Sequence, residues 1–196
     1  MKKQPLIIAV FLLAAAILML PSSGFSAEKK MKETILTLDY TPIKIDSPPC
    51  STKIAVVKFT ESSPIKEIGQ SNLFKYIPSI DVGTWMAKSL YTQLKSEGYN
   101  VEYFETMDEA GDNFIITGVA NKVYVDRPGQ MEMKYKVQLD GMVTKNNKLL
   151  FSKNYISKQQ KAFANTGKNA GKLMSGLHDS FGLFIPQAIK IINESN

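Results

Sequence analysis

The sequence predicts one α+β domain. We expect a mostly antiparallel mixed sheet of about four to six strands that begins with a β-α-β unit and carries two helices on one face. Three patterns support this prediction: a short run that is apolar on both faces, a stretch with apolar residues every four positions, and a long strict alternation of apolar and polar residues. They indicate a covered strand, an amphipathic helix and a half-buried strand.

The β-α-β unit is predicted over residues 53–106. Lys53–Thr60, KIAVVKFT, has apolar side chains on both faces, as a central strand does. Asp81 can cap a helix over 82–97, and Gly98 suits the left-handed residue that follows a helix. The apolar stripe of this helix is Val82, Met86, Leu90 and Leu94. A strand over 100–106 then completes a right-handed parallel crossover.

An antiparallel meander is predicted next. A strand over 113–126 is followed by a strict alternation over 130–144, and Asn146-Asn147 turns the chain into a third strand over 149–158. The alternating strand should bury one face and expose the other. The residues expected on its buried face are Met131, Met133, Tyr135, Val137, Leu139, Gly141 and Val143.

The last predicted strand and helix complete the domain. Lys153 and Lys158 suit an edge strand that resists further pairing. Residues 169–193 have apolar positions at three- and four-residue spacing, which predicts a helix. Pro186 lies inside it, and we expect a kink or a break there because proline removes a helical hydrogen bond.

The N-terminus has the pattern of a secretory signal peptide. Lys2 and Lys3 precede the apolar run Leu6–Leu20, and small residues lead to a cleavage site after Ala27. Since a bilayer-spanning helix needs about 20 apolar residues, an uncleaved anchor is the alternative. The expected organisation is a signal peptide over 1–27, an extended leader or edge segment over 28–52, and one domain over 53–196, in a periplasmic protein.

Cys50 is the only cysteine. A lipid-attachment cysteine follows the signal peptide directly, whereas Cys50 lies thirty residues after Leu20, so we expect no lipid on it. It has no intrachain partner for a disulfide. An intermolecular bridge or a free thiol remains open, beside the simpler interpretation of a small half-buried residue at a strand start.

Charge is distributed unevenly along the chain. The net charge is +6, Glu97–Asn113 holds six acids and no basic residue, and Gly141–His178 holds seven lysines and no acid. Such asymmetry can steer a partner, or it can simply keep two surfaces solvated. After removal of Lys2 and Lys3 the charge is too small to indicate nucleic-acid binding.

No pattern points to catalysis, a cofactor or a metal. Zinc needs three or four ligands, and the chain has one histidine, His178, and one cysteine. We expect His178 on a helix surface. Gly167–Leu173, GKNAGKL, has three residues between its glycines where a phosphate-binding loop needs four, and Leu173 stands where that loop needs Ser or Thr.

The segment 61–80 is predicted to be a long loop. Connections are usually about 4–6 residues, so a loop of this length favours a functional role. Phe74, Tyr76 and Ile77 form an apolar cluster in it. They are the candidate partner-binding residues, with packing against the domain's own sheet as the alternative.

The order of these signals resembles a known family. TLDYTP, STKIAVVKFTESSP, Ile68-Gly69, the amphipathic helix, EGYNVEYF and FSKNYISK are similar to the YajG-type lipoproteins and the related auxiliary lipoproteins of ABC-type transporters. The resemblance covers residues 34–160. It implies a location in the Gram-negative envelope, and it implies no defined activity for the protein. The chain departs from the family in lacking a lipobox cysteine, and Thr60–Pro64 replaces the commoner Asp-x-Arg-Pro.

These observations together predict a non-enzymatic accessory or binding protein of the envelope. Its expected partner is an envelope protein or a lipid component, which could associate it with the outer or inner membrane, and its oligomeric state stays open. The alternative is a carrier of a lipid or other apolar ligand in an ABC-type transport system. An empty apolar space between helices and sheet would favour the carrier, and a filled core would favour the binding protein.

Overall fold

The structure is a computed structural model that describes residues 31–70, 74–127, 132–162 and 168–196. Met31–Asn196 forms one compact unit. The predicted signal peptide and Met131 lie outside the described residues. No helix within the described ranges is long and apolar enough to cross a membrane.

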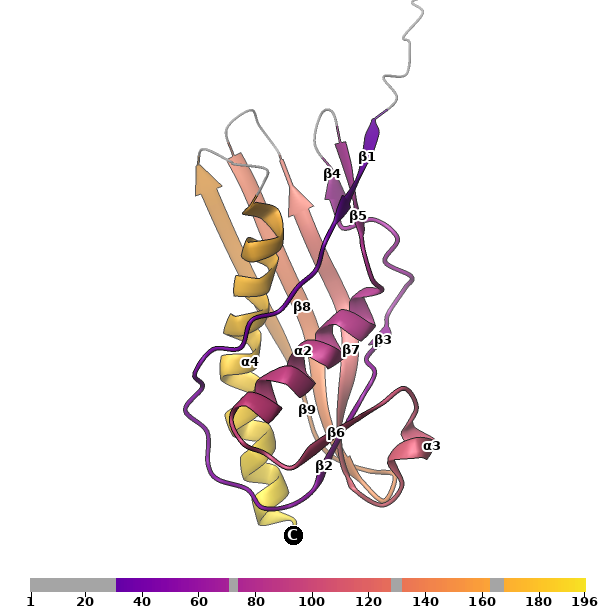
Figure 1. Ribbon diagram of the computed structural model, residues 1–196, viewed down its shortest axis with the longest axis vertical. Coiled ribbons are helices and arrows are strands. Elements are labelled where there is room, and N and C mark those ends of the chain that lie inside the picture. Colours follow the sequence, from indigo (N-terminus) through magenta and orange to yellow (C-terminus); the bar gives the residue numbers. More distant parts are fainter. Residues whose placement is uncertain (1–30, 71–73, 128–131, 163–167) are drawn as a thin grey trace, which may run out of the picture. The chain divides into compact units, whose positions relative to one another are not determined.

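The sheet is organised around one long strand, β7 (Phe114–Asp126). Along one edge it pairs antiparallel with β8 (Glu132–Lys145), which pairs antiparallel with β9 (Lys148–Ala162) (Figure 1). The predicted meander is therefore confirmed, and β9 is the edge strand. The alternation is also confirmed, because every described residue of the expected buried face, from Met133 to Val143, is buried.

Three short parallel strands share the other edge of β7: β2 (Ile54–Val57), β3 (Thr60–Glu61) and β4 (Gly69–Gln70). Beyond them, β6 (Val101–Phe104) pairs parallel with β2. The parallel relation expected between β2 and β6 is therefore present, although three further strands lie between them in the chain.

At the far end of the sheet, β5 (Phe74–Pro78) pairs antiparallel with β4 and parallel with β1 (Lys32–Leu36). Within the described residues the sheet has nine strands, so the expected four to six was too few. The expectation of a long irregular loop over 61–80 was also wrong, because β4 and β5 form there. These pairings depend on partners distant in sequence, which local patterns do not reveal.

Two helices cover one face of the sheet, as expected. α2 (Val82–Ser96) and α4 (Asn169–Glu194) bury their apolar stripes in one common core (Figure 1). The short α3 (Met107–Ala110) lies on the opposite face. Its Ala110 packs into a second small cluster with Ala55, Val57 and Ile115. β2 is therefore covered on both faces, as its sequence predicts.

Side-chain caps fix the start of α2. Asp81 accepts a hydrogen bond from Thr84 N at 2.8 Å, which confirms the predicted cap. Glu61 accepts from the backbone N–H groups of Val82 at 2.8 Å and Gly83 at 3.3 Å. These bonds satisfy N–H groups that have no partner inside the helix. The helix ends before Gly98, whose φ of +86° is the left-handed conformation expected there.

α4 packs on the sheet with almost no intervening space. A Cβ built on Gly141 of β8 would lie 2.5 Å from Phe184 Cε2, and one on Gly176 of α4 would lie 2.9 Å from Val137 Cγ2. Glycine is therefore required at both positions for this close approach. The helix continues through Pro186, so of the expected kink or break the break does not occur. Burial of its apolar face outweighs the one lost hydrogen bond.

Candidate functional site

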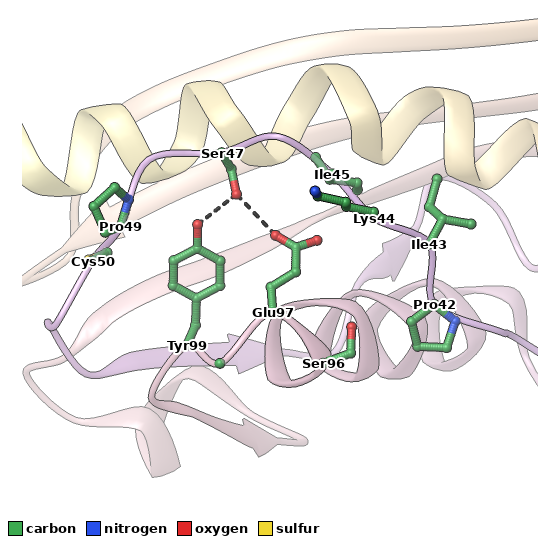
Figure 2. Close-up of a pocket in the computed structure, with 11 residues that line it drawn as sticks. Pro42, Ile43, Lys44, Ile45, Ser47, Pro49, Cys50, Ser96, Glu97 and Tyr99 are labelled. Atoms are coloured by element: carbon green, nitrogen blue, oxygen red, sulfur yellow. Dashed lines mark hydrogen bonds between the residues drawn. The ribbon is translucent and has the colours of Figure 1, made fainter.

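Residues 37–53 form an extended strap that runs from β1 to β2 without regular structure. Between this strap and the C-terminal end of α2 lies a hollow of about 700 Å³, shown in Figure 2. The side chains that line it come from the strap, from the last turn of α2 and from the following turn. Those labelled in Figure 2 are Pro42, Ile43, Lys44, Ile45, Ser47, Pro49, Cys50, Ser96, Glu97 and Tyr99.

Gln93 of α2 anchors the strap beside this hollow. Its side chain is completely buried. The amide oxygen accepts from Tyr40 OH at 2.7 Å and from Ile43 N at 3.0 Å, while Nε2 donates to Ile43 O at 2.6 Å. Nε2 also contacts the Glu97 carboxylate. Burial of Tyr40, with Glu97 nearby, raises the pKa of its phenol. Tyr40 therefore stays a protonated donor at neutral pH.

Ser47, Glu97 and Tyr99 form the polar side of the hollow (Figure 2). Ser47 Oγ lies 3.0 Å from Glu97 Oε2 and 2.6 Å from Tyr99 OH, and Tyr99 OH donates to Pro48 O at 2.7 Å. Burial raises the pKa of Tyr99; the Ser47 hydrogen bond opposes this rise and the Glu97 charge adds to it. A protonated phenol cannot act as the base that a serine nucleophile needs. The arrangement holds the strap in place.

Cys50 lies at the end of the hollow. It is half-buried and packed against the main core, which confirms the predicted half-burial, but it lies in the strap and not at a strand start, because β2 begins at Ile54. The prediction that it carries no lipid is not tested by its position.

His178 holds the strap from α4. Its Nε2 lies 2.9 Å from Thr41 O, and its ring meets that of Tyr40 edge-on with 5.1 Å between centroids. It is a partly exposed helix residue, as expected. Within the described part of the chain, no three His, Cys, Asp or Glu side chains are grouped so that they could hold a metal ion.

The predicted partner-binding residues lie together on β5 but face different ways. Tyr76 is only 3% exposed and belongs to the main core, whereas Phe74 and Ile77 are half-buried. Ile77 stands beside Ile35 of β1, whose side chain is 71% exposed. Tyr76 is therefore buried, whereas Ile35 and Ile77 form a pair that faces outward. Partner binding by Phe74, Tyr76 and Ile77 stays a prediction.

Sequence reasoning missed Gln93 and Ile35. Gln93 precedes Leu94 on the apolar side of α2, and a polar side chain in such a place is a signal that it meets buried backbone groups. Ile35 lies in the segment predicted as an extended leader or edge, and its side chain points to the opposite face from those of Thr34 and Leu36, so it could have been assigned to the outward face.

No protein-family model and no curated protein matches the sequence. Solved structures do resemble the fold. Protein XCC0632 from Xanthomonas campestris, of family-model DUF330, has a TM-score of 0.63 at 11% identity, covering 83% of this chain and 98% of that one. A second crystal structure, of an uncharacterized protein, has a TM-score of 0.50 at 10% identity, covering 85% of this chain and 100% of that one.

A third likeness is lipoprotein GNA1162 from Neisseria meningitidis, with a TM-score of 0.39 at 15% identity, covering 67% of this chain and 99% of that one. Identities this low relate folds and not activities. Membership of the YajG-type family stays a prediction. The chain has the α+β fold of the Xanthomonas protein.

Proposed function

We propose that the chain is a non-enzymatic accessory protein of the cell envelope that binds another envelope protein. The export pattern of residues 1–27 and the resemblance to envelope lipoproteins support the location. The α+β fold shared with the Xanthomonas protein is compatible with such a role. The hollow beside the strap supports a non-enzymatic role, since Ser47, Glu97 and Tyr99 are hydrogen-bonded to one another and to Pro48 O.

The observation that carries the proposal is the filled space between α4 and the sheet. The ring of Phe184 occupies the position above Gly141, and Val137 occupies the position above Gly176. An apolar ligand needs a concave apolar site, so this packing disfavours the lipid carrier.

The surface we propose for the partner is the β1–β5 edge, defined by Ile35 and Ile77. These isoleucines stand side by side on the face turned away from the core. Within the described residues β1 pairs with β5 alone, so its other edge offers unpaired backbone groups. An edge strand with adjacent apolar side chains suits a partner that adds a strand. Phe74, on β5, packs against the main core and so supports this edge from the inner side.

Site-specific photo-crosslinking in cells tests this proposal. A photoreactive amino acid at position 35 or 77 should give a crosslink to the same envelope protein. The matched control is position 183 on α4, where leucine is 61% exposed. Crosslinking from 183 as strong as from 35, or crosslinks from 35 and 77 to lipid only, would contradict the proposal.

A further inference from the structure

The face of β7, β8 and β9 that is turned away from α2 and α4 carries a cluster of lysines. The register places Tyr124, Lys136 and Lys158 in one row across the three strands. Lys122 lies two residues from Tyr124 on β7, and Lys134 and Gln160 form the next row beyond Lys136 and Lys158. A hollow of about 510 Å³ lies over these residues, which we call the lysine face.

Lys136 and Lys158 stand directly opposite each other on neighbouring strands. Like charges in such pairs destabilise a sheet. No ion pair between described residues involves either of them, while Lys134 lies 3.7 Å from Glu132. Lys122 Nζ lies 4.9 Å from the centroid of the Tyr124 ring. Lys136 and Lys158 therefore stand opposite each other without an ion pair among the described residues, where an anionic ligand would relieve their repulsion.

Protection of a sheet edge explains only part of this pattern. Lys158 lies on the edge strand β9, where lysine discourages pairing with another chain. Lys136 lies on β8, which is paired on both sides, and Lys122 lies on β7, which is also interior. Lysines on interior strands do nothing for an edge, so three of the four lysines on this face need another explanation.

The chemistry of the lysine face limits its occupant. A peptide cannot add as a strand here, because the backbone groups of β8 are already paired on both sides. Asp126 and Glu132 lie at one end of the face and would repel a continuous anionic membrane plane. A narrow polymer can follow the row of lysines and avoid these acids. The amide of Gln160 and the ring of Tyr124 suit hydroxyl groups and the apolar face of a sugar.

We propose that the lysine face binds an acidic polysaccharide, whose carboxylates meet Lys136, Lys158 and Lys122. This site is separate from the β1–β5 edge and does not depend on the partner proposed there. Lysine acts as a point charge, so the contacts should be electrostatic and sensitive to salt.

The test measures binding of the chain from Glu28 onward to polygalacturonate by isothermal titration calorimetry, with dextran as the uncharged polymer. We expect binding to polygalacturonate and none to dextran. Lys136→Gln with Lys158→Gln should weaken the affinity about tenfold or more, the scale of charge contacts across an interface. The matched control, Lys148→Gln with Lys190→Gln, removes the same charge outside the lysine face and should bind like the wild type.

Raising the salt from about 0.05 M to about 0.5 M should weaken binding, because the Debye length shortens. The double variant should melt no lower than the wild type, since it removes a like-charge pair. If it fails to fold, Lys122→Gln alone should still weaken binding, and Lys136→Arg with Lys158→Arg should keep it. No binding to polygalacturonate, equal losses in test and control variants, or tighter binding to vesicles of anionic phospholipid would each overturn the proposal.

Discussion

Phe184 of α4 lies against Gly141 of β8 so closely that three of its ring carbons fall within 2.8 Å of where a Cβ on residue 141 would stand. This contact sets the distance between the helix and the sheet along the middle of the core. It also closes the space that a carrier of apolar ligands would need.

Gly141→Ala should therefore destabilise the domain. The added methyl group overlaps Phe184, and overpacking of a filled core costs about 1–3 kcal/mol. Denaturant unfolding followed by circular dichroism measures the loss. Gly182→Ala on α4 is the control, because nothing lies within 4 Å of its Cβ position. Alanine is the better helix former there, so the control should unfold at equal or higher denaturant. A Gly141→Ala variant as stable as the control would contradict this packing.

Gln93→Leu should release the strap. Leucine fills similar space but leaves Tyr40 OH and both backbone groups of Ile43 without partners, and each unsatisfied buried group costs about 1–3 kcal/mol. Hydrogen exchange measured by mass spectrometry should rise over residues 39–50. Thr92→Ala, on the exposed side of the same helix, should leave exchange there unchanged. Protection of 39–50 that survives Gln93→Leu would show that other contacts hold the strap.

Two substitutions at Tyr76 distinguish the contribution of its buried ring to stability from that of its hydroxyl group. Its OH is buried without a hydrogen-bond partner among the described residues. Tyr76→Phe should therefore be neutral or stabilising, whereas Tyr76→Ala should cost about 3–5 kcal/mol as a large-to-small change in the core. Thermal and denaturant unfolding measure both variants. A stable Tyr76→Ala variant that loses its partner would return Tyr76 to the binding surface.

Asp81 makes the start of α2 sensitive to acid. Burial opposes its ionisation, but hydrogen bonds with Thr84 and the charge of Lys58, whose Nζ lies 3.4 Å from Asp81 Oδ2, lower its pKa below 3.8. Because the folded pKa is below the unfolded one, the stabilisation is present above about pH 4 and is lost as pH falls through the folded pKa.

The stability difference between wild type and Asp81→Asn should therefore shrink as pH is lowered from 7 toward 3. Denaturant unfolding at each pH measures the free energies. Lys58→Gln should reduce the difference at pH 7, since it removes the nearby cation. A difference that stays constant over this range would mean that the carboxylate charge has no stabilising role.

The exported form should begin near Glu28 and carry no lipid on Cys50. Intact-mass measurement of the protein purified from the envelope decides both points. Cys50→Ser should shift the mass only by the change of one atom and leave the protein in the same fraction. A mature chain that starts at Cys50 with a diacylglyceryl group would refute the expectation.

The elements that sequence predicted well are those with a long, regular pattern. β8 alternates along its length, and α2 has both a cap at Asp81 and a glycine after its end, so local rules were sufficient. β3 and β4 consist of two residues each and exist because β7 offers an edge to pair with. No pattern of two residues can predict that.

In the candidate site, too, the sequence could predict only what depends on residues close together in the chain. Half-burial of Cys50 and the surface position of His178 followed from their neighbours in sequence. The roles of Gln93 and Glu61 did not, because both side chains bond to backbone that is distant along the chain. Of the lysine face only Lys158 lies in the lysine-rich segment 141–178 of the sequence, and only the strand register places Lys136 opposite it.

The strap also bears on the order in which the protein is made. Its first contacts along the chain include Thr41 with His178, and its last include Pro49 O, which accepts from Asn193 Nδ2 at a separation of 144 residues. A segment synthesised early can thus meet α2 first, through Gln93, but gains its contacts with α4 only when that helix is complete. Contacts between such distant residues form late because closing long loops costs entropy. A nascent chain stalled before residue 178 should therefore leave the strap less protected against protease than in the full chain, and full resistance should appear only when synthesis is nearly complete.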